Sequence, residues 1–304
     1  MVAAATEVVR PRRILVIANP AAGVRRGGSA GERAAGAASR AGGAVALELT
    51  RQPGDARRLA ERAASSGFDL VLAAGGDGTV NEAANGLAGT GVALGVAPAG
   101  TMNLLARVLG LPLDPEQAVA RVIEGYRPLV LHPGTAAGRV FLLMAGAGFD
   151  AWVLRELLRG VRAKIGFGDY VRGAIRGLRT FPFPRLRVEH DGGVVTAHTA
   201  IIGRAPLYGG FLRPTPHARL DKDLLELCAI DGGAARLAAV FPRLWSGAHA
   251  GCPGITLVPA RRVEIAAPID DLPYHVDGEL AGNLPVVVSL SRRILVLATP
   301  RRSP

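Results

Sequence analysis

The residues with the clearest potential for chemistry lie in GGDGT, residues 75–79, where an apolar run gives way to a segment with helical spacing. Its glycines allow a sharp turn and a close approach of backbone N–H groups to a ligand. The helix that follows, which Thr79 or Asn81 could cap, attracts anions to its first turn. Asp77 would repel phosphates there unless a divalent cation lay between them or the carboxylate handled a proton. We therefore interpret the stretch as a magnesium–nucleotide loop, with a tight structural turn as the alternative.

Two further polar loops follow apolar runs in the same half of the chain. They are NPAAG, residues 19–23, and PAGTMN, residues 98–103. Each combines hydrogen-bonding side chains with a glycine that lets a ligand approach the backbone. The sequence contains no GxxxxGK[ST] string, which excludes a P-loop kinase. It also has no GxGxxG after the first apolar run, which argues against a nicotinamide or flavin dehydrogenase. The candidate ligand-binding residues are Asn19, Pro20, Gly23, Arg25 and Arg26 in the first loop and Gly100, Thr101 and Asn103 in the second.

An acidic pair lies far downstream, in YHVDGELAG, residues 274–282. Asp277 and Glu279 flank Gly278, and two residues at this spacing on a strand point to the same face. Two carboxylates on one side of a turn can serve as metal ligand and general base. Taken alone, the pair is more typical of a solvated strand end.

The composition limits the classes of function. A chain of 304 residues with 49% hydrophobic and 20% charged residues is typical of a globular protein, and it is long enough for two domains. The formal charge of +11 is compatible with nucleic acid, an anionic membrane surface or an anionic substrate. However, only Lys164 and Lys222 are lysines, so an arginine-rich genomic composition explains the charge equally well. Because no motif of a nucleic-acid-binding fold occurs, no nucleic-acid partner is expected.

Cysteine and histidine positions give no metal or redox motif. Cys228 and Cys252 are expected to be free thiols in a reducing compartment, and no two histidines have the i, i+4 spacing of a metal site. No apolar stretch approaches the roughly 20 residues that span a bilayer. We therefore expect a cytoplasmic protein that touches a membrane only peripherally.

The elements that must position the three loops alternate along the first hundred residues. Apolar strand-like runs and segments with helical periodicity succeed one another, which predicts a doubly wound α/β sheet. In such a sheet ligands bind at the carboxyl ends of the strands, where all three loops fall. In the last helix Asp114 can act as the cap, Pro115 suits the first helical position and Gln117 completes a capping box. The expected strands cover 14–20, 44–50, 69–76 and 92–98, and the expected helices cover 31–43, 55–67, 102–110 and 113–125.

After about residue 130 the chain changes to short strand-like runs separated by turn residues, so we expect a second, mostly antiparallel β domain. The first domain is expected over 1–130 and the second over 131–290, and the apolar run within 291–304 can return to either. The strand-like runs are 140–150, 185–190, 194–202, 224–230, 262–267, 272–280 and 286–290, and helical segments are expected at 151–162 and 168–181.

The three loops and the acidic pair, in this order, resemble the diacylglycerol kinase catalytic-domain family, which includes bacterial lipid kinases and the sphingosine and ceramide kinases. NPAAG is similar to the family element NPxSG, with Ala22 in place of serine, and PAGTMNLLARVLGLP is similar to PxGTxNdxAr. GGDGTVNEAANGL, AGAGFDAWV, YGGFLRPTPHARLDKDLLEL and VDGE look like further landmarks of the family. GGDGT alone is shared with NAD kinases, which look like a related fold.

The resemblance implies an ATP- and Mg²⁺-dependent lipid kinase, with diacylglycerol or a sphingoid base as acceptor and the active site in the cleft between an ATP-binding domain and a β-rich lipid-substrate domain. It implies that Glu279 takes the proton from the lipid hydroxyl, and that Asp77 and Asp277 organise metal and acceptor. The nucleotide-binding residues that it implies are Asn19, Pro20, Gly23, Thr50, Gly75, Gly76, Asp77, Gly78, Thr79, Asn81, Gly100, Thr101 and Asn103.

One departure from the family concerns a second metal. Related bacterial enzymes carry an Asp-Gly pair in the second domain whose aspartate helps to hold a structural magnesium, whereas here the aligned pair is Lys222 and Asp223. Asp221 or Asp223 could supply the ligand after a shift, or Lys222 could occupy the site with its own charge. These alternatives stay open at this point.

A lipid kinase must also reach the bilayer surface, and one helical segment combines basic and apolar residues. Packing inside the second domain is the favoured role of its apolar residues, and membrane contact is the alternative. Two other functions stay open, an NAD kinase-like small-metabolite kinase and an idle lipid- or nucleotide-binding regulator. Whether the chain forms a homodimer is also open. The residues of the segment and its continuation are Trp152, Leu154, Arg155, Leu158, Arg159, Arg162, Lys164, Phe181 and Phe183.

Overall fold

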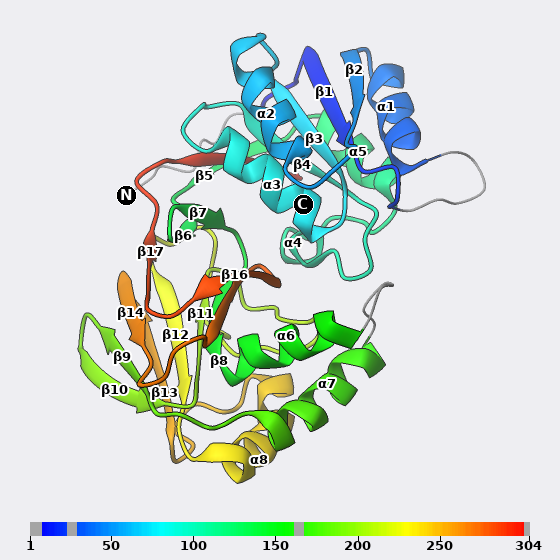
Figure 1. Ribbon diagram of the computed structural model, residues 1–304. Coiled ribbons are helices and arrows are strands. Elements are labelled where there is room, and N and C mark those ends of the chain that lie inside the picture. Colours follow the sequence, from blue (N-terminus) through cyan, green and yellow to red (C-terminus); the bar gives the residue numbers. More distant parts are fainter. Residues whose placement is uncertain (1–7, 23–28, 161–166, 301–304) are drawn as a thin grey trace. The chain divides into compact units, whose positions relative to one another are not determined.

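The computed structural model describes residues 8–22, 29–160 and 167–300 (Figure 1). The chain forms two compact units. The first runs to Pro133 and includes the segment that begins at Ser291, and the second comprises Gly134–Leu290. Among the described residues, no helix is both long and apolar enough to cross a membrane.

The first unit contains a six-stranded sheet in the order β2-β1-β3-β4-β18-β5. Neighbouring strands are parallel except for β18 and β5, which confirms the predicted doubly wound sheet. The central strands β1, β3 and β4 are almost entirely buried, and this is why they read as continuous apolar runs. The strands are β1 (Arg13–Ala18), β2 (Ala44–Leu49), β3 (Leu70–Gly75), β4 (Ala93–Pro98), β5 (Arg127–Leu131) and β18 (Leu295–Thr299).

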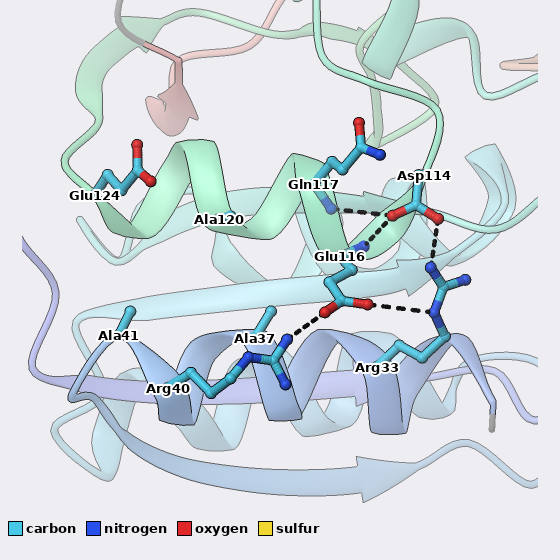
Figure 2. Close-up of a pocket in the computed structure, with 9 residues that line it drawn as sticks. All are labelled: Arg33, Ala37, Arg40, Ala41, Asp114, Glu116, Gln117, Ala120 and Glu124. Carbon is cyan, nitrogen blue, oxygen red and sulfur yellow. Dashed lines mark hydrogen bonds and ion pairs between the residues drawn. The ribbon is translucent and has the colours of Figure 1, made fainter. Parts of the chain in front are cut away.

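Helices cover this sheet in two pairs, with α1 packed against α5 and α2 against α3. Helix α1 begins with a capping box that we did not predict, in which Ser29 and Glu32 exchange hydrogen bonds. At α5, Asp114 accepts hydrogen bonds from the backbone of Glu116 and Gln117 as predicted. Figure 2 shows no bond from the side chain of Gln117 back to Asp114, so the helix has a simple cap in place of the expected capping box. The helices are α1 (Ala30–Arg40), α2 (Asp55–Ser65), α3 (Asp77–Leu87), α4 (Leu104–Val108) and α5 (Pro115–Ile123).

The second unit contains two antiparallel six-stranded sheets, in the orders β10-β9-β14-β17-β6-β7 and β13-β12-β11-β8-β15-β16. Apolar side chains from both sheets share one core, for example Leu186 and Val263 from one and Leu227 and Val276 from the other. The second domain is therefore mostly antiparallel, as predicted. Its strands are β6 (Gly134–Ala136), β7 (Arg139–Phe141), β8 (Met144–Gly148), β9 (Leu186–His190), β10 (Gly193–Ala197), β11 (Thr199–Gly203), β12 (Leu225–Ile230), β13 (Ile255–Ala260), β14 (Arg262–Ala266), β15 (Pro273–Val276), β16 (Glu279–Asn283) and β17 (Val286–Leu290).

Three predicted elements of this unit differ from the structure. The expected strand 194–202 divides at His198, because β10 pairs in one sheet and β11 in the other. The run 140–150 divides between β7 and β8, which also belong to different sheets. The run 272–280 is a hairpin, and helix α8 was not anticipated. The helices are α6 (Phe149–Gly160), α7 (Phe167–Thr180) and α8 (Gly233–Ser246).

The aromatic residues near α6 and α7 pack together inside the unit. Phe181 lies edge-on to Phe149 and Trp152, with ring centroids 5.6 and 5.5 Å apart. Phe183 contacts the same group, and Leu154 is buried. Packing is thus the observed role of these side chains. Leu158 is 48% exposed, while Arg162 and Lys164 lie outside the described residues.

Candidate active site

The candidate site of the first unit lies at the carboxyl ends of its parallel strands, where the backbones of four loops meet. The N–H of Asn19, after β1, donates to the carbonyl of Ala74 in β3 at 3.0 Å. The N–H of Thr50, after β2, donates to Ala18 at 2.9 Å, and the N–H of Ala99, after β4, donates to Gly75 at 2.9 Å. Parallel pairing therefore brings together loops that are far apart in the sequence.

The loops that follow β3 and β4 touch each other at Gly76 and Gly100. A Cβ built on Gly100 would lie 2.5 Å from the Cα of Gly76, a distance that no side chain tolerates. The two backbones approach so closely because Gly100 carries no side chain; a Cβ on Gly76 would be tight but less restrictive, 3.3 Å from the Cα of Gly100. Gly76 is the N-cap of α3, so this contact lies at the positive end of that helix, where phosphates bind favourably.

Asp77 joins the same two loops through its side chain. It is the first residue of α3, and its Oδ1 accepts a hydrogen bond from the N–H of Leu105 at 3.3 Å, in the first turn of α4. Burial raises the pKa of Asp77, while backbone N–H groups at Leu104, Leu105 and Asn103 oppose that rise. A cation held by this carboxylate would also favour its charged form. A half-buried carboxylate beside a helix start is therefore a suitable ligand for a magnesium ion that carries phosphates.

Asn103 fixes the conformation of the loop that follows β4. It adopts a left-handed conformation with φ of 49°, and its side chain forms a two-way contact with Gly100. Its Oδ1 accepts from the Gly100 N–H at 2.8 Å, and its Nδ2 donates to the Gly100 carbonyl at 3.0 Å. Thr101, between them, is exposed and available to a ligand. A small cavity of about 80 Å³ lies beside this loop, lined also by Arg33 of α1.

The remaining predicted nucleotide residues divide into exposed and buried ones. Pro20 is exposed and Thr50 half-buried, and the Oδ1 of Asn19 accepts from the N–H of Ala21 to close a tight turn. Gly23, with Arg25 and Arg26, lies outside the described residues. Gly78 is half-exposed at the start of α3.

Two predicted ligands, Thr79 and Asn81, point into the protein. Thr79 packs on Gly75, where an added Cβ would lie 2.5 Å from the Thr79 hydroxyl oxygen. Asn81 is 2% exposed, and its side-chain oxygen accepts from Asn85 at 3.1 Å. These contacts favour a role in holding the loop for both residues, over direct contact with a nucleotide.

In the second unit, Asp277 lies in the two-residue turn of the β15–β16 hairpin. Asp277 and Gly278 have φ of 46° and 82°, as the tight turns that suit Asp-Gly require. The carboxylate accepts three backbone N–H bonds from the segment that crosses between the two sheets. Oδ2 accepts from Leu142 and Oδ1 from Leu143 and Met144, each at 2.9 Å.

This geometry corrects the expectation that Asp277 and Glu279 lie on one strand and point to one face. Both oxygens of Asp277 accept backbone hydrogen bonds, so its observed role is to anchor the hairpin. Glu279 begins β16, its side chain is 48% exposed, and it forms an ion pair with Arg139 at 2.5 Å. Arg139 is 140 residues away in the sequence, and no local pattern identified it.

The residues considered for a second metal do not form an acidic cluster. Arg219 holds Asp221 through two contacts of 2.8 and 2.7 Å, and its guanidinium lowers the pKa of that carboxyl group. Asp223 is half-buried, and Lys222 is exposed. The described part of the chain contains no group of three or more His, Cys, Asp or Glu residues arranged to hold a metal.

A buried cluster of three polar side chains in the second unit, formed by Asp150, Tyr208 and His275, was not predicted. Asp150, at the start of α6, accepts a hydrogen bond from the Tyr208 hydroxyl and contacts the Nε2 of His275 at 2.7 Å. Asp150 and Tyr208 also line an apolar cavity of about 80 Å³, together with side chains such as Leu212 and Phe241. The stretch AGAGFD contains Asp150 and was the only signal for it in the sequence.

A wider groove of about 680 Å³ lies between α1 and α5 in the first unit (Figure 2). Arg33 pairs with Asp114 and Glu116, and Arg40 pairs with Glu116. These ion pairs link α1 to α5. Because the charges neutralise one another, the paired side chains are not suited to catalysis.

Comparison with known proteins matches both halves of the chain to domain families. Residues 13–129 match the diacylglycerol kinase catalytic domain, and residues 144–299 match the YegS C-terminal NAD kinase beta sandwich-like domain. A diacylglycerol kinase of Staphylococcus aureus strain RF122 is 32% identical over 266 residues, which cover 85% of this chain and 84% of the relative. The relative from strain JH9 has the same identity and coverage.

Solved structures share the fold. A diacylglycerol kinase from Bacillus anthracis superposes with a TM-score of 0.72 at 20% identity, over 96% of this chain and 98% of the other. Another structure from that organism has a TM-score of 0.78 at 22% identity and covers 96% and 99% of the two chains.

Proposed function

The chain belongs to the diacylglycerol kinase family, and from this premise we propose that it transfers the γ-phosphoryl group of ATP to a hydroxyl group of a lipid such as diacylglycerol or a sphingoid base. The observation that carries the proposal is the 32% identity to relatives named diacylglycerol kinase over 85% of the chain. The loop geometry of the first unit supports it, because closely packed glycine backbones at a helix start are suited to a phosphate group.

Phosphoryl transfer depends mainly on positioning and on neutralising charge. In this proposal the loops at Asn19, Gly76 and Gly100 bind the nucleotide, and Asp77 is the magnesium ligand. Magnesium, when bound, neutralises charge on the phosphates. Glu279 accepts the proton of the lipid hydroxyl, a contribution that typically amounts to about 10²–10⁴-fold in rate. Asp277 takes part indirectly, because its hydrogen bonds to Leu142–Met144 fix the turn that precedes Glu279.

The apolar cavity of the second unit is the place that we assign to part of the hydrocarbon chain of the lipid. Its lining is mostly apolar, with Asp150, Thr199 and Tyr208 as the polar residues at its wall. Exposed apolar residues on the neighbouring helices, Leu158 of α6 and Ile175 of α7, suit peripheral contact with a membrane. Each Lys or Arg close to an anionic leaflet adds roughly 1 kcal/mol to such contact.

The test is transfer of radiolabelled phosphate from γ-labelled ATP into lipids in mixed micelles. Diacylglycerol, a sphingoid base and ceramide are offered separately, each with and without Mg²⁺. We expect label in one lipid class and only when Mg²⁺ is present. No label in any lipid would refute the proposal.

A small-metabolite kinase is the second candidate, because residues 144–299 match a domain whose description compares its β sandwich with that of NAD kinase. NAD is therefore included as an acceptor in the same assay. Label in NAD, with none in lipid, favours this candidate. A catalytically idle regulator, by contrast, would bind ATP and label neither acceptor.

A further inference from the structure

Arg204 is a fully buried cation in the second unit. It follows β11 directly, its exposed fraction is 0%, and it begins the loop that returns to β12 at Leu225. Its guanidinium donates hydrogen bonds to the carbonyl oxygens of Arg219 and Leu220, the latter at 2.8 Å. Moving a charge out of water is unfavourable by several kcal/mol unless polar groups compensate it. The loop around Arg204 is therefore built to hold a positive charge.

Negative charges near Arg204 also favour a positive charge at this position. Burial lowers the pKa of Arg204 to about 10, and the negative charges of Asp223 and Asp221 oppose that change, so the guanidinium stays protonated at neutral pH. The carboxylate of Asp221 already contacts Arg219 through both oxygens. Two carbonyl oxygens and the Asp221 carboxylate thus contact cationic side chains of the chain itself, and the charge of Asp223 acts on Arg204.

A structural magnesium, which the family resemblance implies for this loop, does not fit this arrangement. Magnesium needs oxygen ligands at about 2.0–2.1 Å in octahedral geometry. Here the carbonyl oxygens of Arg219 and Leu220 already accept N–H bonds, Asp221 is paired with Arg219, and Lys222 stands where the family resemblance implies an aspartate. A divalent ion would also be placed close to a buried guanidinium of like charge.

We propose that Arg204 is the fixed cation of the loop 204–224, and that this loop folds without the divalent ion that the family resemblance implies there. The loop matters to the molecule because it carries Tyr208, Leu212 and Pro214, which line the apolar cavity. In this chain a side chain therefore determines the shape of that cavity wall, and depletion of divalent ions leaves it intact.

The first test measures thermal unfolding of the full chain by circular dichroism, without nucleotide or lipid, in excess EDTA and in millimolar MgCl₂. We expect the same Tm in both. An ion at one hundred times its Kd would raise Tm by roughly 5–10 °C. Such a rise, lost in either Asp221→Asn or Asp223→Asn, would overturn the proposal. A rise that both variants retain comes from an ion bound elsewhere and leaves the assignment of Arg204 standing.

The second test replaces the cation itself. We expect Arg204→Met to lower Tm by about 10 °C, since two carbonyl groups lose charged donors inside the protein. Arg204→Lys should recover part of the loss, because it keeps the charge but not the two-pronged geometry. Arg219→Met is the matched control, because its side chain is 59% exposed, and it should change Tm by no more than about 3 °C.

A wild-type Tm in Arg204→Met would refute the role of Arg204. If that variant does not fold, the EDTA and MgCl₂ comparison on the wild-type chain decides the question. Both measurements are independent of catalysis, so a chain that phosphorylates no lipid could still pass them.

Discussion

Replacing Asp277 with asparagine distinguishes an anchor from a metal ligand. The carboxylate accepts three backbone N–H bonds of 2.9 Å from Leu142, Leu143 and Met144, and all three donors belong to buried residues. Asparagine tolerates the φ of 46° at this position, so the backbone of the turn is not disturbed. Any effect of the substitution therefore arises from the side chain.

The expected loss of unfolding free energy follows from the individual hydrogen bonds of the carboxylate. In the Asp277→Asn variant the amide oxygen can still accept from Leu143 and Met144, but the amide nitrogen would face the N–H of Leu142, a donor against a donor. One lost charged bond and one unsatisfied donor correspond to about 1–3 kcal/mol of unfolding free energy. Asp277→Gly suits the same φ and removes all three bonds, so its loss should be about 3–5 kcal/mol.

The assay is urea unfolding of the metal-free chain, followed by Mg²⁺ titration of kinase activity. We expect the midpoint urea concentration to fall by roughly 0.5–1 M for Asp277→Asn and by more for Asp277→Gly. Asp270→Asn, an exposed residue in the loop before β15, is the control and should not change it. An unchanged midpoint in Asp277→Asn, together with a higher Mg²⁺ requirement, would refute the anchor and restore the predicted metal ligand.

Three further substitutions test the proposed site. Glu279→Gln should lower kcat by about 10²–10⁴-fold while ATP binding, measured by calorimetry, stays near the wild-type value; unchanged turnover would remove Glu279 as the base. Asp77→Asn should abolish Mg²⁺-dependent activity without lowering apo stability at neutral pH. Burial raises the pKa of Asp77, so the carboxyl group stabilises the fold below pH 3.8, and this stabilisation is lost as pH rises through the pKa of Asp77 in the folded state. A large loss of apo stability at pH 7 in the variant would contradict this. Gly100→Ala should weaken ATP binding, because its Cβ would lie 2.5 Å from the Cα of Gly76; normal affinity would show that the two loops need not touch.

The first sheet could be predicted from the sequence because the evidence for it is local. Strands β1, β3 and β4 are buried on both faces and read as apolar runs, and each ends in turn residues. The second unit is different, since its chain passes from one sheet to the other inside continuous strand-like runs. The pattern 194–202 gives no sign that β10 and β11 separate at His198, because apolar and β-branched residues occur on both sides of it.

The candidate site shows the same limit. The Asp-Gly signal of a hairpin is present at residues 277–278, yet the run 272–280 is expected as one strand, whereas the structure forms two strands joined by a turn there. Arg139 and Arg204 could not be found from the sequence. Their partners lie 140 residues away for Arg139, and 15 and 16 residues away across a loop for Arg204, and long-range pairing leaves no periodic pattern.

The three acidic residues of the proposed site differ in what holds them, and this difference supports their separate roles. Asp77 accepts a backbone N–H from Leu105, and Asp277 accepts three from Leu142–Met144. If either carboxylate moved away, backbone donors would be left without an acceptor, which is unfavourable inside a protein. Glu279 instead pairs with the side chain of Arg139, whose 30% exposure lets water solvate it when the pair opens. Glu279 can therefore exchange its partner for a substrate proton at small free-energy cost, as a general base must in every turnover.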